Sequence, residues 1–135
     1  MPASKKVPAP KGPYSPWVKA AGFIYVSGQG PVNPETGEVF LGDIAGQTRM
    51  TLDNIEAVLE DAGAHLSDVI KTTVFLTDIK NFGAMNEVYA GRFGAIRPAR
   101  TTVQAAALPL GIAVEIDAVA VDPKAGRKIP RLGDE

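Results

Sequence analysis

The chain has 135 residues, which is the size of one domain. Fourteen Lys and Arg residues against 15 Asp and Glu give a net charge of -1, so charge gives no reason to expect binding to nucleic acid. Cysteine is absent and His65 is the one histidine. These counts exclude disulfides, thiolate catalysis and metal sites built from several histidines.

Hydrophobic residues make up 45% of the chain and charged residues 21%, which is typical of a folded domain. We expect a single domain over residues 1–135, with loosely ordered ends at 1–12 and 123–135. No apolar run approaches the roughly 18 residues of a membrane span, and the N-terminus lacks the apolar segment of a secretory signal. The sequence therefore predicts a soluble, cytoplasmic protein with no membrane partner.

The first third of the chain predicts two strands. Residues 14–20 form a short strand in which Pro16 indicates an edge or a start. Residues 23–27, which are mostly aromatic and β-branched, form the second. Residues 28–42 contain four glycines and two prolines and predict a turn-rich connection.

An amphipathic helix follows over residues 44–62, because apolar side chains recur there at spacings of three and four. Asp43 is a suitable N-cap and Gly63 a C-terminal stop. Residues 69–77 then predict a buried strand rich in Val, Ile, Thr and Phe.

The last part of the chain predicts a second helix and two strands. Asp78 or Asn81 caps the helix, which ends before Pro98. Strands follow at 100–106 and 113–121. The helix carries one apolar stripe, made of Phe82, Met85, Tyr89 and Phe93. The order of elements predicts an α+β fold, a mixed sheet with both helices packed on one face.

The final strand leaves the other face of the sheet to be explained. Its alternation places four apolar residues under the helices, namely Val114, Ile116, Ala118 and Ala120, and sends Glu115, Asp117, Val119 and Val121 to the opposite face. That face is either half-solvated or a self-association surface with carboxylates at the rim of a pocket between subunits. In the preceding strand, residues 100–106, the same alternation predicts that Arg100, Thr102 and Gln104 lie on the same face of the sheet as Glu115.

Two charged residues are the main candidates for chemistry. Arg100 opens a strand, and its guanidinium can bind a carboxylate through two hydrogen bonds; the alternative is an ordinary surface arginine. Glu115 lies in mid-strand among apolar neighbours, so it is either functional or paired, with Arg100 as the obvious partner.

One short run and three single residues have weaker claims. The run from Ser27 to Gly30 follows a strand, and its glycines allow a ligand to approach the backbone, although a simple turn explains them equally. Tyr14 and Asn86 are polar side chains beside apolar stretches, where packing or a local hydrogen bond is the alternative. We expect His65 to be exposed and without a role.

An ordered set of motifs resembles the reactive-intermediate/imine deaminase family, also called RidA or YjgF-type proteins. The resemblance covers most of the chain, and it is carried by Gly12-Pro13-Tyr14-Ser15, Ile24-Tyr25-Val26-Ser27-Gly28-Gln29, Thr51-Leu52-Asp53-Asn54-Ile55, Val69-Ile70-Lys71-Thr72-Thr73-Val74-Phe75-Leu76, Met85-Asn86-Glu87-Val88-Tyr89, Pro98-Ala99-Arg100-Thr101-Thr102-Val103 and the run from Leu108 to Ala118. It implies a chorismate-mutase-like fold and a homotrimer with clefts between subunits.

The resemblance also implies an activity and its residues. Family members of the deaminase branch hydrolyse enamines and imines such as 2-aminoacrylate to a 2-keto acid and ammonia, without a metal or organic cofactor. By matching motifs, Arg100 and Glu115 are the implied catalytic residues, and the implied substrate contacts come from Arg100, Tyr14, Ser27, Gly28, Asn86 and Thr102. Many members have cysteine where this chain has Thr102, so no thiol role is expected.

Three interpretations remain open at this stage. The first is a 2-iminobutanoate/2-iminopropanoate deaminase type of enzyme that removes damaging metabolites, with a small imino or keto acid as its partner. The second is a ligand-binding or chaperone-like stress protein without catalysis. The third is an endoribonuclease, which the net charge of -1 and the single histidine disfavour.

Overall fold

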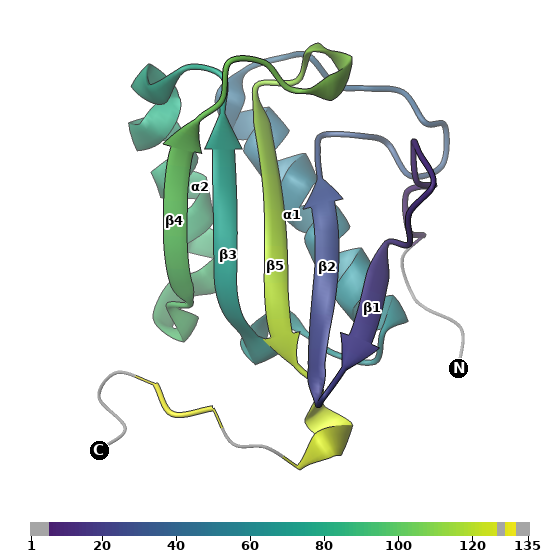
Figure 1. Cartoon of the computed structure of the whole chain (residues 1–135). Helices are drawn as coiled ribbons and strands as arrows, with labels where there is room; N and C mark the ends of the chain where they lie inside the picture. Colours follow the sequence, from purple (N-terminus) through teal and green to yellow (C-terminus); the bar gives the residue numbers. More distant parts are fainter. Residues whose placement is uncertain (1–5, 127–128, 132–135) are drawn as a thin grey trace.

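The computed structural model describes residues 6–126 and 129–131. Its described part folds into one five-stranded mixed sheet with two long helices behind it (Figure 1), which confirms the predicted α+β class. In chain order the elements are β1 (Trp17–Ala20), β2 (Phe23–Gln29), α1 (Ile44–Asp61), β3 (Val69–Leu76), α2 (Phe82–Phe93), β4 (Ala99–Gln104) and β5 (Val114–Val121).

The strands lie in the order β1-β2-β5-β3-β4, so the last strand is the central one. β3 and β4 are parallel neighbours joined by α2, as a helical crossover predicts, and the other pairs are antiparallel. The short connection from β4 to β5 does not make a hairpin, because β5 inserts between β2 and β3. This central position buries the apolar side of β5 under the helices, since Val114, Ile116, Ala118 and Ala120 are at most 2% exposed, as predicted.

Local signals fix the ends of the helices. The side chain of Asp43 accepts a hydrogen bond from the Gly46 N–H at 3.1 Å, and Gly63 beyond α1 has a φ of +86°, a conformation that favours glycine. Before α2, Asp78 accepts from the Lys80 N–H and caps a short 3₁₀ turn. Asn81 occupies the N-cap position of α2 without a side-chain hydrogen bond, so Asp78 is the residue that acts as a cap.

The face of the sheet turned away from the helices is uncovered. Val18, Tyr25 and Val119 lie side by side across β1, β2 and β5, and Val18 and Tyr25 are 54% and 48% exposed. Glu115 and Asp117 lie further along the same face of β5 and are half-buried. The predicted alternation of β5 is therefore confirmed on both faces.

The predicted orientation of β4 is wrong. Arg100 pairs with Thr72, and Thr72 pairs in turn with Ala118, which places the Arg100 side chain on the helix side of the sheet. Thr102 and Gln104 share that side because alternate residues share a face. Val103 lies on the other side of the strand and is 39% exposed on the open face, whereas the predicted alternation required it to lie under the helices. The sequence could not show which side of β4 faces the helices, because β4 is a mostly polar edge strand without a consistent apolar side.

Described residues near both ends of the chain contact the rest of the domain. Val7 packs against the core and Pro8 is buried. At the other end, the Arg131 guanidinium donates to the carbonyls of Ser67 and Val69. Within residues 6–126 and 129–131, no helix is long and apolar enough to cross a membrane.

Candidate functional site

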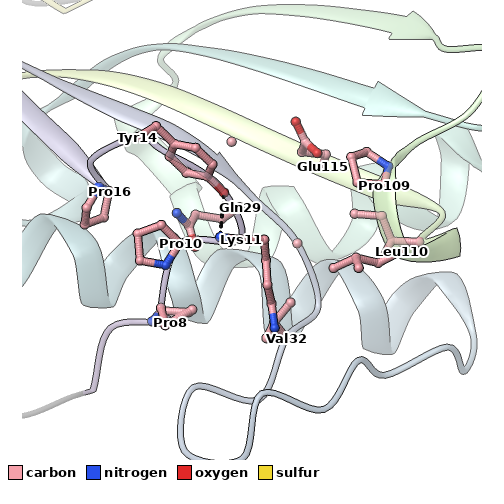
Figure 2. Close-up of a pocket in the computed structure, with 14 residues that line it drawn as sticks. Pro8, Pro10, Lys11, Tyr14, Pro16, Gln29, Val32, Pro109, Leu110 and Glu115 are labelled. Carbon is pink, nitrogen blue, oxygen red and sulfur yellow. Dashed lines mark hydrogen bonds between the residues drawn. The ribbon is translucent and has the colours of Figure 1, made fainter.

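A pocket with a volume of about 90 Å³ opens where β2 ends and β5 begins. Figure 2 shows Tyr14 and Pro16 from the N-terminal segment facing Pro109 and Leu110, with Glu115 of β5 between the two walls. The remaining lining residues are mostly apolar or glycine, namely Pro8, Ala9, Pro10, Lys11, Gly28, Gln29, Gly30, Val32 and Ile112. We call this site the carboxylate pocket.

Glycine at position 28 makes room for the Glu115 side chain. A Cβ added to Gly28 would lie 2.9 Å from Cδ of Glu115 and nearer still to its Oε2. The strand also has an irregular register between Val26 and Gln29, which marks a β-bulge at this place. The bulge and the missing side chain together allow the carboxylate to lie against the backbone of β2.

Burial raises the pKa of Glu115 above its ordinary value, and the negative charge of Asp117 raises it further. A carboxylate with a raised pKa holds a proton more readily than one in water, which suits a group that takes up a proton and returns it. No acidic or histidine cluster in the described ranges could hold a metal ion.

Two other predicted residues lie beside this pocket. Tyr14 is 49% exposed, and its hydroxyl accepts a hydrogen bond from the Lys11 backbone N–H at 3.3 Å (Figure 2). The Ser27 hydroxyl donates to the Ser15 carbonyl at 2.7 Å and so fastens the N-terminal segment to β2. Ser27 is therefore engaged in a structural contact, whereas Tyr14 and Gly28 line the pocket.

Arg100 lies elsewhere, between β4 and α2. Its guanidinium carbon is 4.7 Å from the ring centre of Tyr89 and 5.4 Å from that of Phe82. The ion pairs found within residues 6–126 and 129–131 do not include Arg100. The alternative that Arg100 pairs with Glu115 is thus not found, and the guanidinium has no carboxylate partner among the described residues.

Two polar atoms of the same region are buried without a hydrogen-bond partner in the described part of the chain, namely Oδ1 of Asn86 and Oγ1 of Thr102. Thr102 follows Arg100 by two residues on the same side of β4, and Asn86 projects from the facing helix. Buried polar groups of native proteins are seldom left unpaired, so these atoms indicate a place for another group. We call Phe82, Asn86, Tyr89, Arg100 and Thr102 the arginine site.

The carboxylate pocket and the arginine site are separate within one chain. Glu115 pairs with Phe75 and Phe75 with Val103, three residues after Arg100. Two strand spacings across and three residues along the strand place the Cα atoms of Glu115 and Arg100 roughly 14 Å apart. Because their side chains also lie on opposite faces of the sheet, one small molecule cannot contact both in the same subunit.

Comparison with known proteins identifies the family. The model of the family described as Endoribonuclease L-PSP matches residues 4–122. The chain belongs to this family, which includes the YjgF, RidA and RutC proteins.

Relatives and solved structures agree with this assignment. A RutC family protein of Pyrococcus abyssi is 49% identical over 117 residues, which are 87% of this chain and 92% of the relative. The 2-iminobutanoate/2-iminopropanoate deaminase of Escherichia coli is 44% identical over 122 residues, 88% of this chain and 94% of that enzyme. The crystal structure of the E. coli YjgF gene product superposes with a TM-score of 0.81 at 43% identity, covering 88% of this chain and 95% of that one.

For this member of the L-PSP family, sequence reasoning missed the aromatic surroundings of Arg100. Phe82 and Tyr89 entered only as part of an apolar stripe. Phe82, Asn86 and Tyr89 are at positions i, i+4 and i+7 of α2, a spacing that places all three on one side of the helix. This spacing could have indicated that the two aromatic residues belong to the same site as Asn86. The apolar wall of the carboxylate pocket was also missed, because residues 8–11 come next to the 109–112 turn only through the fold.

Proposed function

We propose that this protein is a hydrolytic deaminase of small 2-imino acids and their enamine tautomers, producing a 2-keto acid and ammonia. The observation that carries the proposal is the Arg100 guanidinium, which is held in place without a carboxylate partner among the described residues and is thus free to bind the carboxylate of a ligand. The name of the E. coli relative supports the choice of 2-imino acids.

The site requires two copies of the chain, because Arg100 and Glu115 cannot reach one small molecule within a single subunit. We propose that the arginine site of one subunit meets the carboxylate pocket of its neighbour in a homotrimer. The row of Val18, Tyr25 and Val119, in which Val18 and Tyr25 are exposed, supports self-association through the open face of the sheet. Three identical sites would result from the cyclic symmetry.

In the proposed reaction, Arg100 binds the substrate carboxylate and the imine carbon lies over the carboxylate pocket. Glu115 accepts a proton from a water molecule, whose oxygen adds to the imine carbon, and passes that proton to the imine nitrogen. In the resulting carbinolamine the hydroxyl proton moves by way of Glu115 to the nitrogen, the C–N bond breaks, ammonia leaves, and the C=O bond of the keto acid forms. Backbone groups of Gly28 and of the 109–111 turn orient the nitrogen and the water.

Ammonia release from 2-iminobutanoate generated in the assay tests the activity. Arg100→Ala should lose nearly all turnover, and full retention would exclude the proposed role of the arginine. A protein that binds the keto acid but releases no ammonia faster than the buffer would instead be a non-catalytic binding protein. Such a protein would bind the ligand without hydrolysing the imine.

Mixed assemblies test the division of the site between subunits. Arg100→Ala and Glu115→Gln subunits, unfolded together and refolded, should recover about a quarter of the wild-type activity, because each site needs one particular ordered pair of subunits. Arg100→Ala mixed with Asn86→Ala is the control, since both changes damage the arginine site. Recovery in neither mixture would mean that Arg100 and Glu115 do not serve the same site from different subunits.

The family description names an endoribonuclease activity. His65 does not support it, because this residue begins a 3₁₀ turn after α1 and is absent from the lining of the carboxylate pocket. The test is incubation of purified protein with a single-stranded RNA, which should remain intact.

A further inference from the structure

Two aromatic side chains of α2 enclose the guanidinium of Arg100. The ring centre of Tyr89 lies 4.7 Å from the guanidinium carbon, and the ring centre of Phe82 lies 5.4 Å from it. Phe82 and Tyr89 are separated by two turns of α2, and the same guanidinium carbon lies near both rings. Both distances lie within the range at which a cation is attracted to the face of a ring.

The ring of Tyr89 is fixed by its surroundings. Its hydroxyl forms a 2.7 Å hydrogen bond with Thr72, the residue that pairs with Arg100 across β3 and β4. Its ring also contacts that of Phe93, with 4.6 Å between the centres, and the side chain is only 8% exposed. Tyr89 is thereby a rigid support against which the guanidinium rests.

Phe82 has a different character. It is 40% exposed and is not part of the hydrophobic core, although the residues of the same stripe that follow it are buried. Core packing therefore does not explain why a large aromatic residue lies at this place. The structure shows this ring in contact with Arg100.

Ring faces attract a guanidinium without using its hydrogen bonds. The five N–H donors of arginine lie in the plane of the group and point outward from its edge, whereas an aromatic ring covers its flat face. A guanidinium held by rings alone keeps its donors available for a carboxylate, while one held by an acidic residue would have them occupied. The neutral Asn86 and Thr102 beside it are consistent with this arrangement.

We propose that Phe82 and Tyr89 form an aromatic clamp that positions Arg100 for two-point binding of a carboxylate. This inference rests on the proposed function, in which Arg100 binds the substrate carboxylate. Phe82 and Tyr89 are positioning residues, because they act on the substrate through Arg100. The clamp restricts the arginine side chain before the ligand arrives, so less of its conformational freedom is lost on binding.

The test measures binding of 2-oxobutanoate, the keto acid product, by titration calorimetry. Phe82→Leu should raise its dissociation constant about two- to fivefold, the loss of one cation–π contact. Phe82→Tyr restores a ring and should bind like the wild type. Ile79→Ala is the matched control, because Ile79 is similarly exposed (46%) one turn earlier in the chain. The methyl ester of 2-oxobutanoate, which lacks the carboxylate, should bind equally to Phe82→Leu and wild type.

Kinetics provides a second measurement. Phe82→Leu should raise KM by the same factor and leave kcat unchanged, because the carboxylate is bound equally in the ground state and the transition state.

The failure of the clamp and the failure of the proposed function give different results. If Arg100→Ala weakens binding of 2-oxobutanoate but Phe82→Leu does not, the clamp is refuted and the arginine anchor stands. If Arg100→Ala binds the keto acid as the wild type does, the anchor itself is refuted, and the clamp with it.

Discussion

Gly28→Ala should remove most of the activity by displacing Glu115, without unfolding the protein. Gly28 has no positive φ, so the backbone accepts alanine, and the obstacle is the Glu115 carboxyl group, with Cδ 2.9 Å from the added Cβ. Ordinary van der Waals contact begins at about 3.4 Å, so the carboxylate must move by up to about 1 Å. A misplacement of about 1 Å costs about 100-fold in rate.

The stability change should be small, because the displaced atoms are the end of a flexible side chain; we expect less than about 1 kcal/mol. Gly91→Ala is the matched control. Gly91 lies inside α2, a Cβ there meets nothing within 4 Å, and alanine should keep kcat and add about 1 kcal/mol of stability.

The assay is ammonia release from 2-iminobutanoate for Gly28→Ala, Glu115→Gln and the double variant. Because the alanine acts by moving the carboxylate, it should cost little more once the carboxylate is gone, so the two effects should be far from additive. Additive losses, or a Gly28→Ala enzyme with more than half of the wild-type kcat beside an inactive Glu115→Gln, would refute the reasoning.

Three further predictions concern stability, measured by urea or thermal unfolding. Glu115→Gln should raise the free energy of unfolding at pH 7, because burial, and then Asp117, raise the pKa of Glu115 and make its ionisation unfavourable for folding. The gain should vanish as the pH falls below the ordinary glutamate pKa, where the carboxyl group is protonated in both states; a gain that grows in acid contradicts this. Thr102→Val should add about 1 kcal/mol by removing a buried hydroxyl without a partner in the described chain, and a loss would mean that the hydroxyl is bonded in the assembled protein. Asp43→Ala should remove about 1 kcal/mol with the loss of its hydrogen bond to Gly46, at unchanged kcat; a fall in kcat would mean that the cap also supports the site.

The sequence was sufficient to predict those features of the fold whose physical cause is local. The cap at Asp43, the stop at Gly63 and the alternation of β5 are set by neighbouring residues and by periodicity, and all three were confirmed. The mixed sheet followed from the order of its elements. The motif resemblance found the family, which the comparisons confirm.

The tertiary structure decided the arrangement of the site. The face on which Arg100 lies depends on the pairing of β4 with β3, and a polar edge strand contains no periodic signal from which to infer it. The contact of Arg100 with Phe82 and Tyr89 joins β4 to α2, and the room that Gly28 leaves for Glu115 joins β2 to β5, so both depend on how the elements pack.

The length of the chain and its lack of cysteine are determined by the sequence alone, and they excluded disulfides and thiolate catalysis before any motif was considered. The fold decided that the two main candidates, Arg100 and Glu115, lie on opposite faces of the sheet. The face on which a side chain lies depends on how its strand pairs with its neighbours, and this pairing is determined by residues of several strands together. The sequence of one strand is therefore not enough to predict it. One chain of this length therefore provides both halves of the proposed site without being able to join them.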